Sequence, residues 1–258
     1  FLSIWIITTY VFLKIIENIF LDKKIYYKEL IILAFLSSFL ISIRILGFVI
    51  FFQFLISLII FFNYKNINLI YFFKQFYKQL LIFLLCLSIF IYILNPIFWL
   101  NPFELINSVK WMSQYFNNIC TLTLGDCMSS LSLPASYYFI WLFFKLPILI
   151  LLGLILFPIV EKQIFNDAIN SIYYGTFVFS SLLIIILFIL LRVNIYDEIR
   201  HIMFIVPLIF LVGLVNLYMF NKKFSYLLLS LTSVFFLIEN INLNPYQYTW
   251  LNSFAKFT

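Results

Sequence analysis

Long runs of apolar residues recur along the whole chain and decide the solvent in which it can fold. Of the 258 residues, 65% are hydrophobic and only 10% are charged, against roughly 25% charged in soluble domains. A soluble domain of this length needs a charged exterior that these residues cannot supply, so we predict that the solvent is lipid. The apolar runs cover residues 1–20, 29–43, 45–62, 80–98, 138–160, 173–191, 202–220 and 225–239.

The length of these runs predicts α-helices that cross a membrane. A helix needs about 20 apolar residues to cross a hydrocarbon core ~30 Å thick. A membrane barrel would need alternating segments of about ten residues, and no such alternation persists here. We therefore predict an all-α, polytopic transmembrane bundle of about eight spans, forming a single membrane domain over residues 1–258. The runs 29–43 and 45–62 are separated only by Arg44, so they form either one bent helix or a pair with a tight turn.

The basic residues between the runs predict the orientation of the chain. One set of alternating loops holds nine Lys residues, and the opposite set holds five Lys and Arg residues. Because cytoplasmic loops collect Lys and Arg, both termini and a long loop over residues 99–137 are expected on the extracytoplasmic side. The net charge of +6 is thus typical of membrane orientation, and it gives no indication of a nucleic-acid partner.

The chain begins at Phe1, inside an apolar run, and ends without a closing element. No charged segment with a cleavage site precedes that first run, so it does not resemble a signal peptide. We expect the sequence to be a fragment that lacks its N-terminal part.

The long outer loop has two local predictions. Residues 103–116 are expected to form a helix capped by Asn101, with Pro102 at its first position. Cys120 and Cys127 face an oxidising compartment, so a disulfide between them is plausible where their Cβ atoms can meet. Two cysteines with no nearby histidine do not suffice for a structural zinc site.

The densest group of charges, residues 192–201, lies directly between two apolar runs and includes the chain's single histidine, His201. In one interpretation it is a solvated turn in which Asp197 and Glu198 pair with the flanking arginines. In the other, Arg200 binds a phosphate through its planar guanidinium group. Helical spacing would also place Asp197 beside His201 and could fix the imidazole tautomer. Because nothing nucleophilic accompanies this pair, it is weak evidence for catalysis.

Lys145 lies in an otherwise apolar stretch and precedes Pro147, which would kink or begin a helix. The side chain either extends to the membrane surface or lines a cavity that receives an anionic substrate. Tyr138 belongs to a group of loop aromatics that fit an interfacial belt.

Four stretches together carry a resemblance to a known family. They are Ile41-Ser42-Ile43-Arg44-Ile45-Leu46-Gly47; Leu124-Gly125 followed by Leu133-Pro134, Tyr138 and Lys145-Leu146-Pro147; Tyr196-Asp197-Glu198-Ile199-Arg200-His201 through Pro207; and Asn244-Pro245-Tyr246-Gln247-Tyr248-Thr249-Trp250-Leu251-Asn252. In this order they resemble the membrane part of GT-C superfamily glycosyltransferases of the family-39, dolichyl-phosphate-mannose mannosyltransferase-like branch. The resemblance extends from about residue 29 to residue 252, with Asn244 standing where the family has histidine.

This resemblance implies an enzyme that moves a sugar from a polyprenyl-phosphate carrier to a glycan, lipid or protein acceptor. We expect a multi-pass protein of a bacterial inner membrane, with its active face extracytoplasmic. The acidic catalytic residue of the family lies in an early outer loop, which would precede Phe1. No cofactor is expected, although some family members use a divalent metal and this possibility stays open. The substrate-binding candidates in this chain are Arg200, His201, Lys145, Asp197 and Tyr138.

Two other functions stay open at this point. The protein could be a noncatalytic scaffold in an envelope-polysaccharide system, or it could be a transporter. A transporter would favour ionisable groups near the bilayer midplane and repeated halves. The charges instead cluster at the expected outer interface, and the sequence has no internal repeat.

Overall fold

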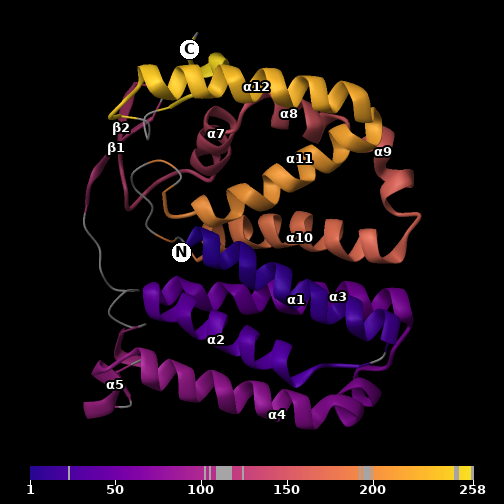
Figure 1. Ribbon diagram of the computed structural model, residues 1–258. Helices are drawn as coiled ribbons and strands as arrows, with labels where there is room; N and C mark the ends of the chain where they lie inside the picture. The colour runs from indigo at the N-terminus through magenta and orange to yellow at the C-terminus, as the bar shows by residue number, and fades with distance from the viewer. Residues whose placement is uncertain are drawn as a thin grey trace. The chain divides into compact units, whose positions relative to one another are not determined.

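The computed structural model describes residues 1–22, 24–101, 103–104, 106–108, 118–123, 125–191, 193, 198, 200–246 and 250–256. The described chain is mostly helical (Figure 1). It divides into two compact units, Phe1–Tyr115 with Ala168–Ser180 and Phe116–Asp167 with Ser181–Thr258. The expectation of a single membrane domain stays a prediction.

The first unit is a group of long helices that pack through apolar side chains and small polar groups. Gln53 Nε2 donates a hydrogen bond to Thr9 Oγ1 (3.0 Å), and the hydroxyls of Thr176 and Ser57 lie 3.0 Å apart. Such buried polar pairs are typical of helix contacts within membranes. The elements are α1 (Leu2–Asp22), α2 (Tyr27–Ile43), η1 (Ile45–Val49), α3 (Ile50–Lys65), α4 (Leu69–Leu94), α5 (Ile97–Leu100) and the first part of α10 (Ala168–Leu190).

The apolar runs 29–43 and 45–62 form a pair of helices joined by a tight turn. Arg44 has an extended backbone between α2 and η1, and its carbonyl accepts a hydrogen bond from Gly47 N (2.7 Å). A Cβ atom at Gly47 would lie 2.6 Å from the backbone carbon of Leu40. Only glycine therefore permits this close approach of η1 to α2.

The second unit packs α8 tightly against α11. A Cβ atom added to Gly153 would lie 2.2 Å from the carbonyl oxygen of Gly213, so the two backbones touch at this crossing. Asn216 Nδ2 also donates to the Gly153 carbonyl (3.0 Å). Small residues allow such close helix contacts in membranes. The elements are β1 (Cys120–Thr123), β2 (Asp126–Ser129), α7 (Ser136–Lys145), α8 (Ile148–Ile155), α9 (Phe157–Ile164), the remainder of α10, η2 (Met203–Ile205), α11 (Val206–Phe220), α12 (Lys222–Asn242) and η4 (Ser253–Lys256).

Six helices among the described residues are long and apolar enough to cross a membrane, and the bent pair α7 and α8 would make a seventh. These candidate spans indicate a multi-pass membrane protein. The count is lower than the eight expected because the run 29–43 forms α2, which has only 17 residues. The run 138–160 is divided among α7, α8 and α9, of which α7 and α8 together form either one broken span or a re-entrant loop.

The all-α expectation is wrong in the long loop, which contains an antiparallel β-hairpin. Cys120 pairs with Ser129 and Thr123 with Asp126 at the two ends of its register. Gly125, in the turn between the strands, has φ of 87°, which glycine adopts without the steric cost of a side chain.

The predicted cap at Asn101 is present. The backbone N of Phe103 donates to Asn101 Oδ1 (3.2 Å), and the described residues 104 and 106–108 are helical. Residues 102, 105 and 109–116 of the predicted helix lie outside the described part of the chain.

Candidate functional site

The candidate site is built around the α7–α8 break, defined as residues 145–148. The axes of α7 and α8 differ by 116° across this break. Pro147 lacks a backbone N–H and disfavours helical conformation in the preceding residue, and Leu146 is extended with ψ of 135°. The proline therefore does more than kink a span, because it separates two helices with very different directions.

Lys145, the last residue of α7, forms an ion pair with Glu198. The lysine side chain is only 9% exposed and the glutamate side chain 33%. A charge this far from solvent needs a partner, which Glu198 supplies. Lys145 is therefore engaged with a carboxylate of the chain itself, a partner that neither interpretation of the sequence had assigned.

The backbone at Glu198 is also attached to α7. Its N–H donates to the hydroxyl of Tyr137 (3.1 Å). Glu198 has φ of 59°, a left-handed conformation that costs a non-glycine residue roughly 1–2 kcal/mol. The contacts with Tyr137 and Lys145 offset this cost and hold the segment in its position.

Tyr138 contributes to the same attachment. Its ring is buried, and its hydroxyl donates to the carbonyl of Val193 (3.4 Å). One turn further along α7, Trp141 Nε1 donates to Thr123 Oγ1 of the hairpin (3.3 Å). Helix α7 thus holds both the hairpin and the segment that leads to Arg200, and Tyr138 serves this packing.

Arg200 and His201 follow Glu198 in a turn that leads into η2. The Arg200 side chain is exposed, and His201 is half-buried. Glu198 has a left-handed backbone, and Arg200 and His201 lie in a turn. Asp197 lies outside the described residues, so its expected place beside His201 stays a prediction.

An apolar groove of about 300 Å³ runs between α8, α12 and the residues that follow α12. Aliphatic and aromatic side chains form most of its wall, and the polar lining groups come from α12 and the residues that follow it. The lining residues are Pro147, Ile148, Leu149, Leu152, Leu228, Leu231, Thr232, Phe235, Phe236, Glu239, Trp250, Asn252 and Ser253. The amino-acid sequence does not indicate this groove, because the groove depends on three segments that are distant in the chain.

Two side chains of the tail close one end of the groove. Trp250 Nε1 donates to Glu239 Oε2 (2.7 Å) at the end of α12. Asn252, which is 2% exposed, donates through Nδ2 to the carbonyls of Phe143 and Leu146. The tail is therefore attached to the carbonyl end of α7, so the groove begins beside the α7–α8 break.

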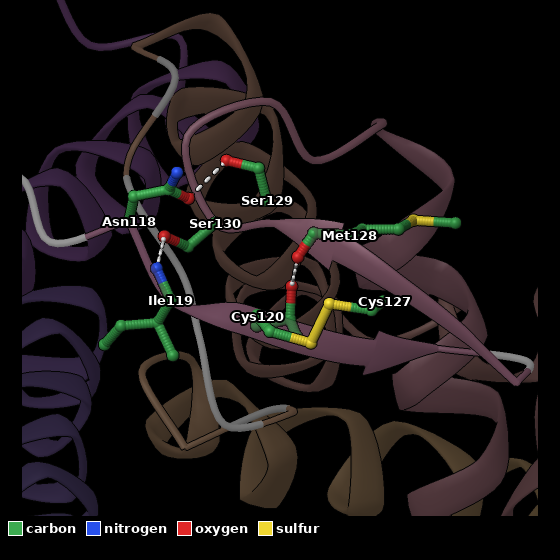
Figure 2. Close-up of a disulfide and its surroundings, with 8 residues drawn as sticks. Asn118, Ile119, Cys120, Cys127, Met128, Ser129 and Ser130 are labelled. Atoms are coloured by element: carbon green, nitrogen blue, oxygen red, sulfur yellow. Dashed lines mark hydrogen bonds between the residues drawn. A yellow bond between two sulfur atoms is a disulfide. The ribbon is translucent and has the colours of Figure 1, made fainter.

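Cys120 and Cys127 are joined by a disulfide, the pairing that the sequence suggested. Figure 2 shows this bond across the hairpin, together with the hydrogen bond from Ser129 Oγ to Asn118 Oδ1 (2.7 Å). Thr121 Oγ1 also donates to the Met128 carbonyl (2.8 Å). The disulfide is diagonal, because the register pairs Cys120 with Ser129. It reinforces the strand pairing that supports Trp141.

Within the described residues, no three His, Cys, Asp or Glu side chains form a group that could hold a metal ion. No protein-family model matches the chain, and no curated protein or solved structure matches it significantly. The family resemblance consequently remains a prediction based on the four sequence stretches.

Proposed function

We propose that the protein is a membrane glycosyltransferase that takes a sugar from a polyprenyl-phosphate carrier. The observation that carries this proposal is the apolar groove between α8 and α12, which begins beside the α7–α8 break. The isoprenoid chain of a polyprenyl phosphate is a long apolar ligand of the kind that such a groove would accommodate, and its anionic head requires a cation outside the groove. The order of the four family-like stretches supports the same assignment.

In this proposal the groove receives part of the isoprenoid chain. The α12 residues that line it extend from Leu228 to Glu239, about 16 Å along the helix. Glu239 would repel a phosphate at its own end, so the carrier phosphate is assigned to the exposed guanidinium of Arg200. A guanidinium group can bind a phosphate through two parallel hydrogen bonds.

The proposed chemistry is displacement at the anomeric carbon of the sugar. The bond from that carbon to the phosphate oxygen breaks, and a bond to the acceptor oxygen forms. The acceptor hydroxyl gives its proton to a general base, and the electron pair of the broken bond leaves with the phosphate. Arg200 stabilises the negative charge that grows on the phosphate, and His201 orients it. Lys145 acts as a positioning residue, because its ion pair with Glu198 holds the segment that bears Arg200.

The proposed topology has both termini and the hairpin on the extracytoplasmic side. It includes α2 as an eighth, short span, since 17 residues extend about 26 Å. The enzyme would then act at the extracytoplasmic face of a bacterial inner membrane on a glycan, lipid or protein acceptor.

The test is an assay for release of polyprenyl phosphate by the complete natural protein in lipid nanodiscs. Polyprenyl-phosphate sugars are supplied with and without candidate acceptors, and the released lipid is measured by mass spectrometry. Arg200→Ala should lower release about 100-fold, since it removes a donor to the leaving group. Lys162→Ala removes an exposed cation at the end of α9 and is the control.

Three outcomes decide the matter. Acceptor-dependent release that is lost in Arg200→Ala and kept in Lys162→Ala supports the proposal. Unchanged release in Arg200→Ala refutes the role of Arg200. Absence of release from every donor by the folded wild type refutes the glycosyltransferase assignment.

One observation favours a transporter as a second candidate. The 116° break between α7 and α8 is a discontinuous membrane helix, and such helices are typical of transporter binding sites. A transporter would accumulate labelled sugar phosphate in proteoliposomes without releasing polyprenyl phosphate. Counterflow uptake in the same preparation distinguishes the two functions.

A further inference from the structure

Helix α4 is longer than is needed to cross the hydrocarbon core of a membrane, and the additional residues lie at its N-terminal end. Its 26 residues extend ~39 Å, against a hydrocarbon core of ~30 Å. Phe76 interrupts the helix with φ of −114° and ψ of 16°. The part after Phe76 has about 18 residues, which is within the length range of a complete span. Residues 69–75 are therefore additional to the span.

The exposed side chains of α4 change their chemistry along the helix. Up to Lys78 they include the cations Lys74 and Lys78, together with Tyr71 and several apolar side chains. From Leu80 to Leu85 the exposed side chains are leucines. Tyrosine and lysine are typical of the lipid headgroup layer and leucine of the hydrocarbon core. The boundary between the two therefore lies close to Lys78.

The cations around this boundary have little compensation from the protein itself. The sequence has no Asp or Glu from residue 30 to residue 103. Across the described residues, Lys65, Lys74 and Lys78 form no ion pair; Lys65 Nζ lies 3.7 Å from the ring centroid of Phe20 and Lys78 Nζ 5.9 Å from that of Tyr77. These ring contacts leave the ammonium groups able to bind anions.

We propose that residues 65–78, which we call the basic segment, bind the phosphodiester headgroups of anionic phospholipids. The first turns of α4 lie in the headgroup layer of one leaflet, and Lys65, Lys74 and Lys78 supply the charge. Phe76 is buried and packs against Phe72 of the same helix (ring centroids 4.9 Å apart), and Phe72 in turn packs against Phe62 of α3 (5.0 Å), so aromatic contacts within the first unit hold this part of α4. This site is separate from the groove and does not depend on the proposed glycosyltransferase activity.

The first test measures lipid selectivity of the full chain by native mass spectrometry from nanodiscs. Equal amounts of phosphatidylglycerol and phosphatidylcholine are offered, and the lipids retained by the protein are counted. The wild type should retain phosphatidylglycerol preferentially, with a roughly fivefold weaker preference for each lysine changed to glutamine. Free glycerol phosphate should not displace the lipid, because the apolar chains contribute to binding.

The matched control variant also loses three lysine charges, but at positions outside the basic segment. Lys65→Gln, Lys74→Gln and Lys78→Gln are combined in one variant, and Lys24→Gln, Lys28→Gln and Lys162→Gln in the other. Selective loss in the first variant supports the proposal. Equal loss in both, or displacement by free glycerol phosphate, refutes a headgroup site at the basic segment.

A second test does not depend on the charges. Spin labels are attached to Tyr71→Cys and, separately, to Leu85→Cys in a chain with Cys86→Ala, and their depth is measured by collision with oxygen and a water-soluble nickel complex. The label at residue 71 should lie at headgroup depth and the label at residue 85 in the hydrocarbon. Equal depths for the two labels overturn the proposal.

Discussion

The ammonium group of Lys145 is almost completely removed from solvent and has the carboxylate of Glu198 against it. Removing one partner of such a pair leaves the other charge without compensation, whereas removing both leaves neither. The partial exposure of Glu198 moderates the effect, because water can reach the site. The ion pair therefore fixes the position of the segment before Arg200, and it is not a large source of stability for the protein.

The interaction free energy between Lys145 and Glu198 can be measured with a double-mutant cycle. Glu198→Gln should destabilise the protein by about 1–3 kcal/mol, because it leaves Lys145 buried and charged. Lys145→Met with Glu198→Gln should cost less than the sum of the two single changes. Thermal unfolding of the four proteins in one detergent supplies the energies, and strict additivity would contradict a direct pair.

Single residues were partly predictable from the sequence. The isolated charge of Lys145 and the cysteine pair stand out against an apolar background, and Pro147 signals a helix break. The partner of Lys145 could not be predicted, because Glu198 follows it by 53 positions and reaches it only through the tertiary fold. The left-handed backbone of Glu198 has no local sequence signal, since glutamate seldom adopts it.

At the scale of the elements, the close crossing of α8 and α11 fixes the position of α8, which forms one wall of the groove. Gly153→Ala should destabilise the protein by about 1–3 kcal/mol, because its Cβ would overlap the Gly213 carbonyl and separate the helices. Gly175→Ala is the matched control in α10, where the nearest atom is the flexible Cδ1 of Ile60 at 3.0 Å. That control should be neutral or stabilising, since alanine favours a helix. Equal melting temperatures for both variants would contradict the close crossing.

The hairpin makes a separate prediction about thiols. The chain has three cysteines, of which only Cys86 is free among the described residues. Unfolded without reductant, it should react with one maleimide, and after reduction with three. Intact-mass measurement gives the count directly. Three adducts before reduction, in protein isolated from an oxidising compartment, would contradict the bond between Cys120 and Cys127.

The boundaries of the helices and strands were less predictable from sequence patterns than the apolar runs themselves. The run 80–98 predicted a span, but α4 begins at Leu69, because Asn68 caps a helix whose first turns contain Lys and Gln. The hairpin strands have four residues each, which is too short for alternation to indicate them. The run 138–160 is apolar except for Lys145, and hydrophobicity alone cannot distinguish a straight span from one divided at Pro147.

At the scale of the whole molecule, the apolar runs sufficed to predict a helical membrane protein. Hydropathy reports which segments avoid water, so it identifies candidate spans. It does not report which lipid-facing surfaces form a groove, because this depends on how helices distant in sequence pack. The groove between α8 and α12 therefore emerged only from the structure.

The proposed orientation can be tested by labelling from one side. In a cysteine-free chain, new cysteines at Lys24 and Lys162 should be reached by a membrane-impermeant maleimide only from the cytoplasmic side. A cysteine at Asn118, beside the hairpin, should be reached only from the opposite side. Labelling of all three from one side would contradict the topology, and gel shifts of intact and opened cells provide the comparison.

The most direct test of the carrier-binding proposal is photochemical. A polyprenyl phosphate with a photoreactive group on its isoprenoid chain is irradiated with the natural protein in nanodiscs, and adducts are mapped by mass spectrometry. We predict adducts on the groove walls, at Leu152 in α8 and at Leu231 and Phe235 in α12, with competition by unlabelled polyprenyl phosphate. Adducts distributed equally over all lipid-facing helices, without such competition, would contradict a carrier-binding groove.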